Sequence, residues 1–115
     1  QPIVKHQSIQ ALLARRASEL AAAYALWREA LRRLLVDHDR EASAYAGMAK
    51  LVCSDLCMAI TVDAVQVFGA SGLSRHGPVE RLMRDAKAFQ IYDGTSQIQA
   101  GMIGKHLERH GLPFA

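Results

Sequence analysis

The 115-residue sequence is poor in aromatic residues, proline and cysteine. Aromatic residues make up only 6% of the chain, whereas apolar residues make up 50%, with alanine and leucine supplying much of that share. This balance favours closely packed helices over a β-sandwich. A chain of this length is large enough for one hydrophobic core and too short for two. The predicted fold class is therefore all-α, with residues 1–115 forming one helical domain.

Long runs of like charge are absent, and so are long apolar runs free of charge. The chain carries 14 Lys and Arg against 11 Asp and Glu, and the net charge of +3 is spread along its length. This distribution disfavours a nucleic-acid-binding arm. Without a run of about 18 uncharged apolar residues, we expect no membrane span. No secretory signal is visible.

The two cysteines, Cys53 and Cys57, lie four residues apart in an apolar helical pattern. This spacing places both on one helix face and suits a disulfide poorly. We expect buried free thiols in a reducing compartment, which favours the cytoplasm. A metal site at this pair is disfavoured, because no third ligand lies nearby.

Apolar periodicity predicts four helices joined by short connections, and hence a four-helix bundle that is antiparallel in part. The first covers about residues 3–36, and the second, residues 41–68, is apolar on most sides and is expected at the centre. The third begins at Pro78, and the fourth runs from Thr95 to about residue 110 with Thr95 or Ser96 as its cap. The side chains expected to face the core are Ile9, Leu12, Leu13, Leu20, Ala23, Trp27, Leu31, Leu34 and Leu35, then Val79, Leu82, Met83 and Ala86, then Ile98, Met102, Ile103 and Leu107.

Asp93 stands directly before Gly94, where the last helix is expected to begin. The first N–H groups of a helix lack internal partners and favour a nearby anion. The ordinary role of an Asp-Gly pair at such a place is a turn or a cap. A carboxylate there can also act as a base. Spacing alone leaves both roles open.

The segment Leu82–Gln99 closely resembles the C-terminal α-helical domain of the acyl-CoA dehydrogenases. The resemblance extends without insertion from the loop at Gly69 through Gln99 and includes Pro78–Lys87. In that family the motif at this place reads Tyr-Glu-Gly-Thr, with the glutamate as the catalytic base, so the resemblance implies that Asp93 is the base here. The family's counterpart of residues 1–7 lies inside a longer polypeptide, after a helical domain and a β-domain. The chain, which opens at Gln1, is therefore expected to be a fragment.

The resemblance implies α,β-dehydrogenation of an acyl-CoA or another acyl thioester, a reaction of fatty acid metabolism. The base removes the α-proton while hydride passes from the β-carbon to N5 of FAD, and hydrogen bonds to the thioester oxygen stabilise the developing charge. One of these bonds comes from the backbone N–H of the base residue. Tyr92 and Gly94 are the implied substrate-binding residues. The resemblance also implies a homo-oligomer, a dimer or tetramer, possible transfer of electrons to an electron-transfer flavoprotein, and an inactive isolated fragment.

Two groups of residues correspond to flavin contacts in the family. Thr95 and Gln97 match positions that touch FAD, which suits a phosphate-bearing ligand near a helix N-terminus. Gln66, Gly69 and Ala70 resemble a Gln-x-x-Gly-Gly element that touches the flavin of a neighbouring subunit. Ala70 replaces the second glycine, which weakens this contact if the backbone there needs positive φ or a very close approach. The alternative for this segment is a plain helix stop.

Aspartate is one methylene shorter than glutamate, so its carboxylate withdraws by roughly 1 Å, a misplacement that can lower a rate on the order of a hundredfold. Nitroalkane oxidases resemble these enzymes and use an aspartate base, which leaves a nitroalkane oxidase-like or monooxygenase-like reaction open. Another alternative is a catalytically decayed bundle retained for oligomerisation or partner binding. Some family members carry the base on an earlier helix, a region outside this chain.

Other polar residues are assigned structural roles. His106 and His110 lie four apart and could bind a metal together, but positive charge near a helix C-terminus is the simpler interpretation. We expect Arg81, Arg84, Asp85 and Lys87 to form a solvated or interhelical charge network.

Overall fold

A computed structural model describes residues 1–114, and in this range the chain forms helices and no strand. The helices are α1 (Gln7–Arg32), α2 (Ala42–Phe68), α3 (Val79–Phe89) and α4 (Ser96–His110). Three short helical segments, η1 (Ile3–Lys5), η2 (Arg33–Asp37) and η3 (Gly69–Leu73), flank them. The prediction of an all-α fold with four helices is confirmed.

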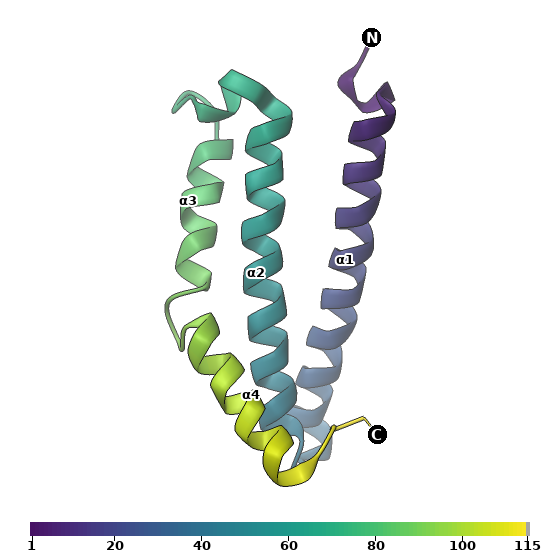
Figure 1. Ribbon diagram of the computed structural model, residues 1–115, viewed down its shortest axis with the longest axis vertical. Helices are drawn as coiled ribbons and strands as arrows, with labels where there is room; N and C mark the ends of the chain where they lie inside the picture. The colour runs from purple at the N-terminus through teal and green to yellow at the C-terminus, as the bar shows by residue number, and fades with distance from the viewer. Residues whose placement is uncertain (115) are drawn as a thin grey trace.

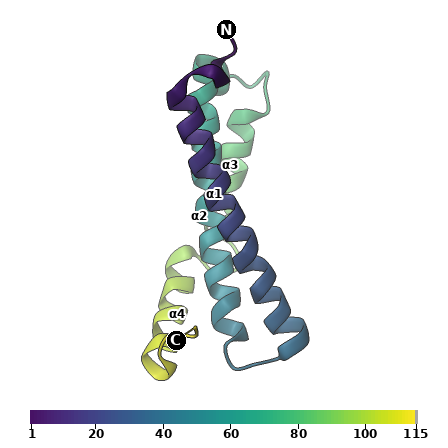
Figure 2. The same cartoon turned by 90° about the vertical axis from the view of Figure 1, so that its right-hand side faces the viewer.

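Helix α2 lies at the centre of the molecule. Figure 1 shows α1 and α3 on either side of it, while α4 continues below α3 along the other half of α2. In the view turned by 90°, α1 and α2 cross, and α4 lies apart from α1 at the lower end (Figure 2). The molecule is elongated, with extents of 52 × 27 × 24 Å.

The helix ends follow local sequence signals. The predicted first helix begins as the short η1 segment, and α1 starts after an extended residue, His6. The predicted break at residues 37–40 is present, with His38 in the left-handed conformation at φ 48°. Pro78 precedes α3, where its fixed φ suits a helix start. Thr95 caps α4, because its side-chain oxygen accepts a hydrogen bond from the Ile98 N–H.

Polar contacts and small residues hold α1 and α2 together in antiparallel orientation. Near the start of α1, Arg16 pairs with Asp63 near the end of α2 at 2.6 Å. Toward the other end of the pair, Ala30, Tyr45 and Ala49 form the buried cluster of the core. The Arg33 guanidinium lies 4.2 Å from the centre of the Tyr45 ring, a cation–π contact that covers this cluster.

A small residue on α2 allows α4 to approach. Gly47 is buried, and a Cβ at this position would lie 3.2 Å from the Gln99 side chain and 3.4 Å from that of Ile103. Helix α4 thus packs closely against the first turns of α2, which places its N-terminus and the preceding loop beside the middle of α2.

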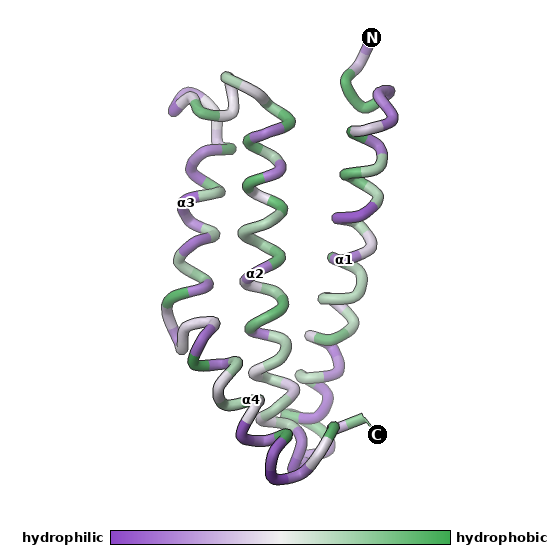
Figure 3. Tube along the Cα trace, in the orientation of Figure 1, coloured by the Kyte–Doolittle hydropathy of each residue, from purple (hydrophilic) through white to green (hydrophobic). Residues whose placement is uncertain are grey.

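The expected core-facing side chains are only partly covered. Val79 and Ala86 are buried as expected, but Leu82 is 50% exposed. The same correction applies to the exposed side chains of Leu13, Leu20, Trp27 and Leu31 on α1, of Leu34 and Leu35 in η2, and of Ile98 and Met102 on α4. The reason is geometric: one neighbouring helix covers only part of a wide apolar stripe. Figure 3 shows hydrophobic residues along most of α2 and in patches along α1.

The segment Ala42–Leu73 is long and apolar enough to cross a membrane by length and composition. The expectation that no such segment exists was therefore too strict, because isolated charges do not disqualify a span. The central helix of a helical bundle meets the same criteria. Here Lys50, Asp55 and Asp63 of α2 each bond to a neighbouring element.

Candidate active site

The loop at residues 90–95 joins α3 to α4 and carries Asp93 (Figure 1). Asp93 and Gly94 both have left-handed backbone conformations, with φ of 52° and 90°. The cap of α4 is Thr95, so Asp93 is not the capping residue. Within residues 1–114 the Asp93 carboxylate makes no hydrogen bond or ion pair. Its backbone is therefore part of a turn, while its side chain has no structural partner.

Side chains from α2 and α4 hold this loop from several directions. Lys50 Nζ donates to the Gly94 carbonyl at 2.5 Å. Asp55 Oδ1 accepts from Gln90 Nε2 at 2.7 Å and from Ser96 Oγ at 3.0 Å, so one carboxylate oxygen ties both ends of the loop to α2. Gln99 Nε2 donates to the Asp93 carbonyl at 3.3 Å.

An apolar hollow of about 360 Å³ opens beside Asp93. Tyr92 and Phe89 form one wall, with their ring centres 5.5 Å apart. The opposite wall comes from one face of α2. The residues that line the hollow as a whole are Lys50, Cys53, Ser54, Cys57, Phe89, Tyr92 and Asp93. The arrangement places a carboxylate at the edge of an apolar surface, a setting in which a ligand that covers the surface removes water from the carboxylate.

The two cysteines of this wall are free thiols, as expected, but they are half-buried rather than buried. The Cys53 thiol contacts the Ala23 carbonyl of α1 with its sulfur at 3.8 Å. Burial raises the pKa of the Cys53 thiol. A thiol with a raised pKa is mostly protonated at neutral pH and is a poor nucleophile, so Cys53 is a packing residue.

Thr95 and Gln97 lie at the N-terminus of α4, on the other side of the loop. Together with Lys87, Gln90, Ile91 and Ser96 they line a hollow of about 220 Å³. Hydroxyl and amide donors, a lysine ammonium and a helix N-terminus form a suitable surface for a phosphate-bearing ligand.

Gln66, Gly69 and Ala70 lie at the far end of α2 and are exposed. Gly69 has φ of 60°, which favours glycine, whereas Ala70 is not among the residues with positive φ. Alanine is therefore accommodated by the backbone of η3. Eleven residues separate Gln66 from Asp55, so this group lies about 16 Å along α2 from the loop at Asp93. The two groups of candidate cofactor residues occupy separate surfaces.

Sequence reasoning missed the residues that hold the loop. Lys50 and Asp55 are isolated charges in an otherwise apolar helix, and such charges require partners. This signal was present in the sequence, but the partners lie 44 and 35 residues away along the chain. Only the packing of α4 and α3 against α2 reveals them.

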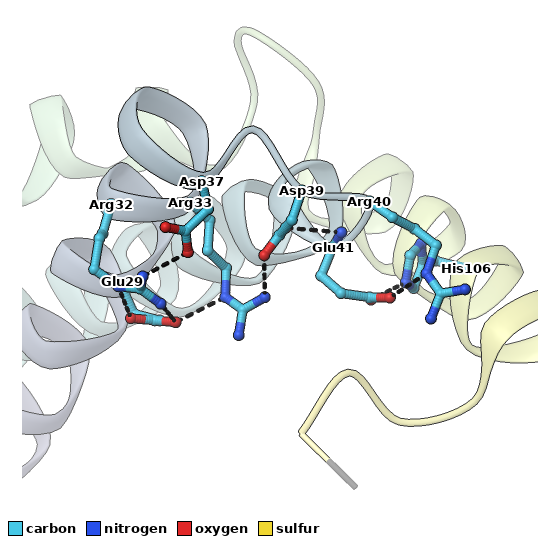
Figure 4. Close-up of polar contacts among 8 residues, drawn as sticks. All are labelled: Glu29, Arg32, Arg33, Asp37, Asp39, Arg40, Glu41 and His106. Carbon is cyan, nitrogen blue, oxygen red and sulfur yellow. Dashed lines mark hydrogen bonds and ion pairs between the residues drawn. The ribbon is translucent and has the colours of Figure 1, made fainter.

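A second polar cluster lies at the opposite end of α4, where it meets the α1–α2 connection (Figure 4). His106 Nε2 lies 2.5 Å from Glu41 Oε2, and the His106 and His110 ring centres are 4.8 Å apart. The hydrogen bond to His106 is the main reason that the pKa of Glu41 is lowered. Glu41 thus links the start of α2 to the last turn of α4, and within residues 1–114 no group of three metal-binding side chains includes these histidines.

The charged residues of α3 form local pairs. Arg84 bonds to Glu80 at 2.7 Å, and Arg81 lies 3.9 Å from Asp85, in both cases across one helical turn. Lys87 donates to the side chain of Gln90 at 2.9 Å. These exposed contacts agree with the expected charge network.

Comparison with known proteins identifies the family. Residues 1–108 match the family described as acyl-CoA dehydrogenase, C-terminal domain. The chain belongs to the acyl-CoA dehydrogenase family. It is 44% identical over 106 residues to cyclohex-1-ene-1-carbonyl-CoA dehydrogenase of Geobacter metallireducens, an alignment that covers 92% of this chain and 28% of that protein.

Solved structures share the fold. The structure of butyryl-CoA dehydrogenase from Megasphaera elsdenii matches with a TM-score of 0.89 and 39% identity, over 95% of this chain and 28% of that one. A chain in the structure described as electron transferring flavoprotein of Acidaminococcus fermentans matches with a TM-score of 0.88 and 37% identity, over 95% and 28% of the two chains. This acyl-CoA dehydrogenase domain thus spans just over a quarter of the length of these relatives.

Proposed function

We propose that this chain serves as the C-terminal domain of an FAD-dependent acyl-CoA dehydrogenase and that Asp93 removes the α-proton of the acyl thioester. The observation that carries the proposal is the placement of Asp93. By the family resemblance it corresponds to the base position. In the structure it lies in a left-handed turn, with its carboxylate unpaired within residues 1–114 and next to an apolar hollow. A carboxylate that served only as a cap or an ion-pair partner would be bonded.

The chemistry follows from the setting of the carboxylate. A carboxylate in water is a weak base for a carbon acid, because water stabilises its charge. An acyl group that covers the hollow excludes this water and strengthens the base. Tyr92 contributes apolar surface to the wall. By the family resemblance, the backbone N–H of Asp93 would donate to the thioester oxygen and stabilise the enolate-like charge that forms when the α-proton is removed.

The residues expected to contact FAD fit such a group. Thr95 and Gln97 offer donors beside the N-terminus of α4, where a pyrophosphate is favoured, and Gln66, Gly69 and Ala70 offer a second, exposed contact surface. FAD, when bound, supplies the acceptor for the hydride that leaves the β-carbon. Because the two surfaces are separate, we assign them to two FAD molecules of neighbouring subunits, as in a dimer or tetramer.

The substrate proposed is the CoA thioester of a compact acid. The relatives support this class, since they are dehydrogenases of cyclohexane-1-carbonyl-CoA, cyclohex-1-ene-1-carbonyl-CoA and butyryl-CoA. An electron-transfer flavoprotein is the proposed electron acceptor. The free thiols support a reducing compartment such as the cytoplasm.

The test uses the full-length polypeptide that contains this domain, loaded with FAD. Flavin bleaching is followed after mixing with cyclohexane-1-carbonyl-CoA, butyryl-CoA or palmitoyl-CoA. We expect Asp93→Asn to slow bleaching on the order of a thousandfold with unchanged flavin content, because the amide cannot accept the proton. Asp93→Glu, which restores the family's residue, is expected to retain activity. Bleaching by Asp93→Asn at the parental rate would disprove the base assignment.

The aspartate also favours a second candidate function, a nitroalkane oxidase-like reaction. In that case nitroalkanes would bleach the flavin and oxygen would be consumed without a dedicated acceptor. If the full-length protein binds no flavin at all, the domain is a helical module for oligomerisation or partner binding instead.

A further inference from the structure

The loop that carries Asp93 is held by a lysine whose position is electrostatically unusual. Lys50 projects from the middle of α2 and donates to the Gly94 carbonyl at 2.5 Å, directly before the N-terminus of α4. The N-terminus of a helix carries partial positive charge and disfavours a cation. If Lys50 served only to attach α4 to α2, a cation at this place would be unfavourable. The Lys50 ammonium therefore requires a hydrogen-bond acceptor.

The acceptor is the Gly94 carbonyl of the loop. Lys50 and Asp93 line the same hollow, and Lys50 is half-buried there. The lysine ammonium has three N–H donors, so its bond to Gly94 leaves others available on the side of the hollow. Among residues 1–114 the polar groups that line this hollow come from α2 and the loop, namely Lys50, Cys53, Ser54, Cys57, Tyr92 and Asp93.

The loop backbone needs such support because two successive residues adopt left-handed conformations. Asp93 at φ 52° is a non-glycine residue in a region that side chains disfavour, and Gly94 follows at φ 90°. Gln99 holds the peptide plane after Asp93 through the Asp93 carbonyl, and Lys50 holds the next plane through the Gly94 carbonyl. The first of these planes adjoins the Asp93 Cα, whereas the second lies one residue further along the chain and acts on Asp93 through the Gly94 backbone, since each peptide is rigid.

We propose that Lys50 is a positioning residue for the base Asp93, which fixes the Asp93–Gly94 turn by its bond to the Gly94 carbonyl. This inference rests on the proposed function of Asp93. Asp55 ties the two ends of the loop at Gln90 and Ser96, whereas Lys50 acts at its centre. Loss of Lys50 therefore leaves the loop attached to α2 but releases the turn that aims the carboxylate.

The experiment uses the full-length, FAD-loaded polypeptide and compares Lys50→Met, Lys50→Arg and, as a matched control, Lys105→Met. Lys105 is an exposed residue of α4 and lines neither the hollow beside Asp93 nor the hollow at Thr95 and Gln97. For Lys50→Met we expect kcat for flavin reduction to fall about ten- to a hundredfold, because misplacement of a reacting group by roughly 1 Å costs that much. The expected KM, flavin content and melting temperature remain close to those of the parent protein.

Lys50→Arg keeps a cationic donor and is expected to recover at least a third of the lost rate, and Lys105→Met is expected to match the parent. Full activity of Lys50→Met, or equal losses in Lys50→Met and Lys50→Arg, would overturn the proposal. A loss of flavin or of several degrees in melting temperature in Lys50→Met would also overturn it, since that pattern marks a purely structural lysine. If Asp93→Asn is fully active, the proposed function fails first, whatever Lys50 does.

Discussion

At the scale of single residues, the site depends on one backbone turn rather than on an unusual side chain. Aspartate and glycine both tolerate the left-handed region better than most residues. Glycine has no side chain, and the side chain of aspartate is short enough to be compatible with this conformation. The Asp93–Gly94 pair therefore suits this turn, which turns the chain from α3 into α4. An aspartate in place of the family's glutamate shortens the reach of the carboxylate but remains compatible with the turn.

Gly94 is expected to be intolerant of substitution. Its φ is 90°, and a Cβ there would lie 2.6 Å from Gln99 Nε2, the atom that donates to the Asp93 carbonyl. We expect Gly94→Ala to lower the free energy of unfolding by about 1–3 kcal/mol, since alanine is strained at this φ. Urea denaturation of the full-length protein measures the lower stability. Flavin bleaching measures the slower reaction that is also expected.

Gly104 of α4 provides the control for this substitution. A Cβ at Gly104 meets no atom within 4 Å, and the residue is helical. Alanine is the better helix former by about 0.5–1 kcal/mol, so Gly104→Ala is expected to be neutral or stabilising. Equal urea midpoints for the two variants would show that the turn does not require glycine.

At the scale of helices, ionic contacts close the ends of the bundle where few large side chains are buried. Glu29 lies near the end of α1 and accepts from both Arg32 and Arg33, while Arg33 also reaches Asp39 in the turn before α2 (Figure 4). The Arg33–Asp39 bond links the end of α1 to the turn before α2, and Glu29 holds both arginines in place. This network takes the place of a helix-capping side chain at the α1–α2 connection.

The Glu29 network makes the α1–α2 connection sensitive to acid. The hydrogen bonds of Arg32 and then of Arg33 lower the pKa of Glu29 from 4.5 to about 2. Because the pKa is lower in the folded state, the stabilisation is present above about pH 4.5 and is lost as the pH falls toward about 2. Protection factors from hydrogen exchange at residues 33–42 are expected to drop over this interval. In Glu29→Gln the drop contributed by this group is expected to be absent, and an identical acid profile in both proteins would contradict the assignment.

At the scale of the whole molecule, the chain exposes more surface than a compact protein of its size. Its accessible surface is 7921 Å², whereas a compact monomer of 12.6 kDa exposes roughly 6,200 Å². The radius of gyration is 17.0 Å, compared with about 13 Å for a compact chain of this length. Much of the excess is apolar, so the helices present surface for further protein to cover.

A stripe along α1, continued by Leu35 of η2, defines one such surface. Its members are Leu20, Tyr24, Trp27, Leu31 and Leu35, which are 39–66% exposed and recur at three- and four-residue intervals. The isolated chain is therefore expected to self-associate, as sedimentation velocity would show. Leu31→Glu is expected to shift it toward monomer because a buried carboxylate in the contact is unfavourable. Ala25→Glu, at an exposed position outside the stripe, serves as the control. A monomeric parent chain at micromolar concentration would contradict this expectation.

The helices, their order and most of their ends were determined by the sequence itself. The signals are local: apolar periodicity, the turn residues around position 38, Pro78 and Thr95. Local signals can be recognised in a sequence without knowledge of the fold. The same holds for the family motif at residues 92–95.

What the tertiary structure decided is which helix faces are covered and how the loop that carries Asp93 is held. Lys50, Asp55 and Gln99 meet this loop only because α3 and α4 pack against the middle of α2. The exposure of the α1 stripe was likewise decided by packing, since one neighbouring helix covers only part of a wide apolar face.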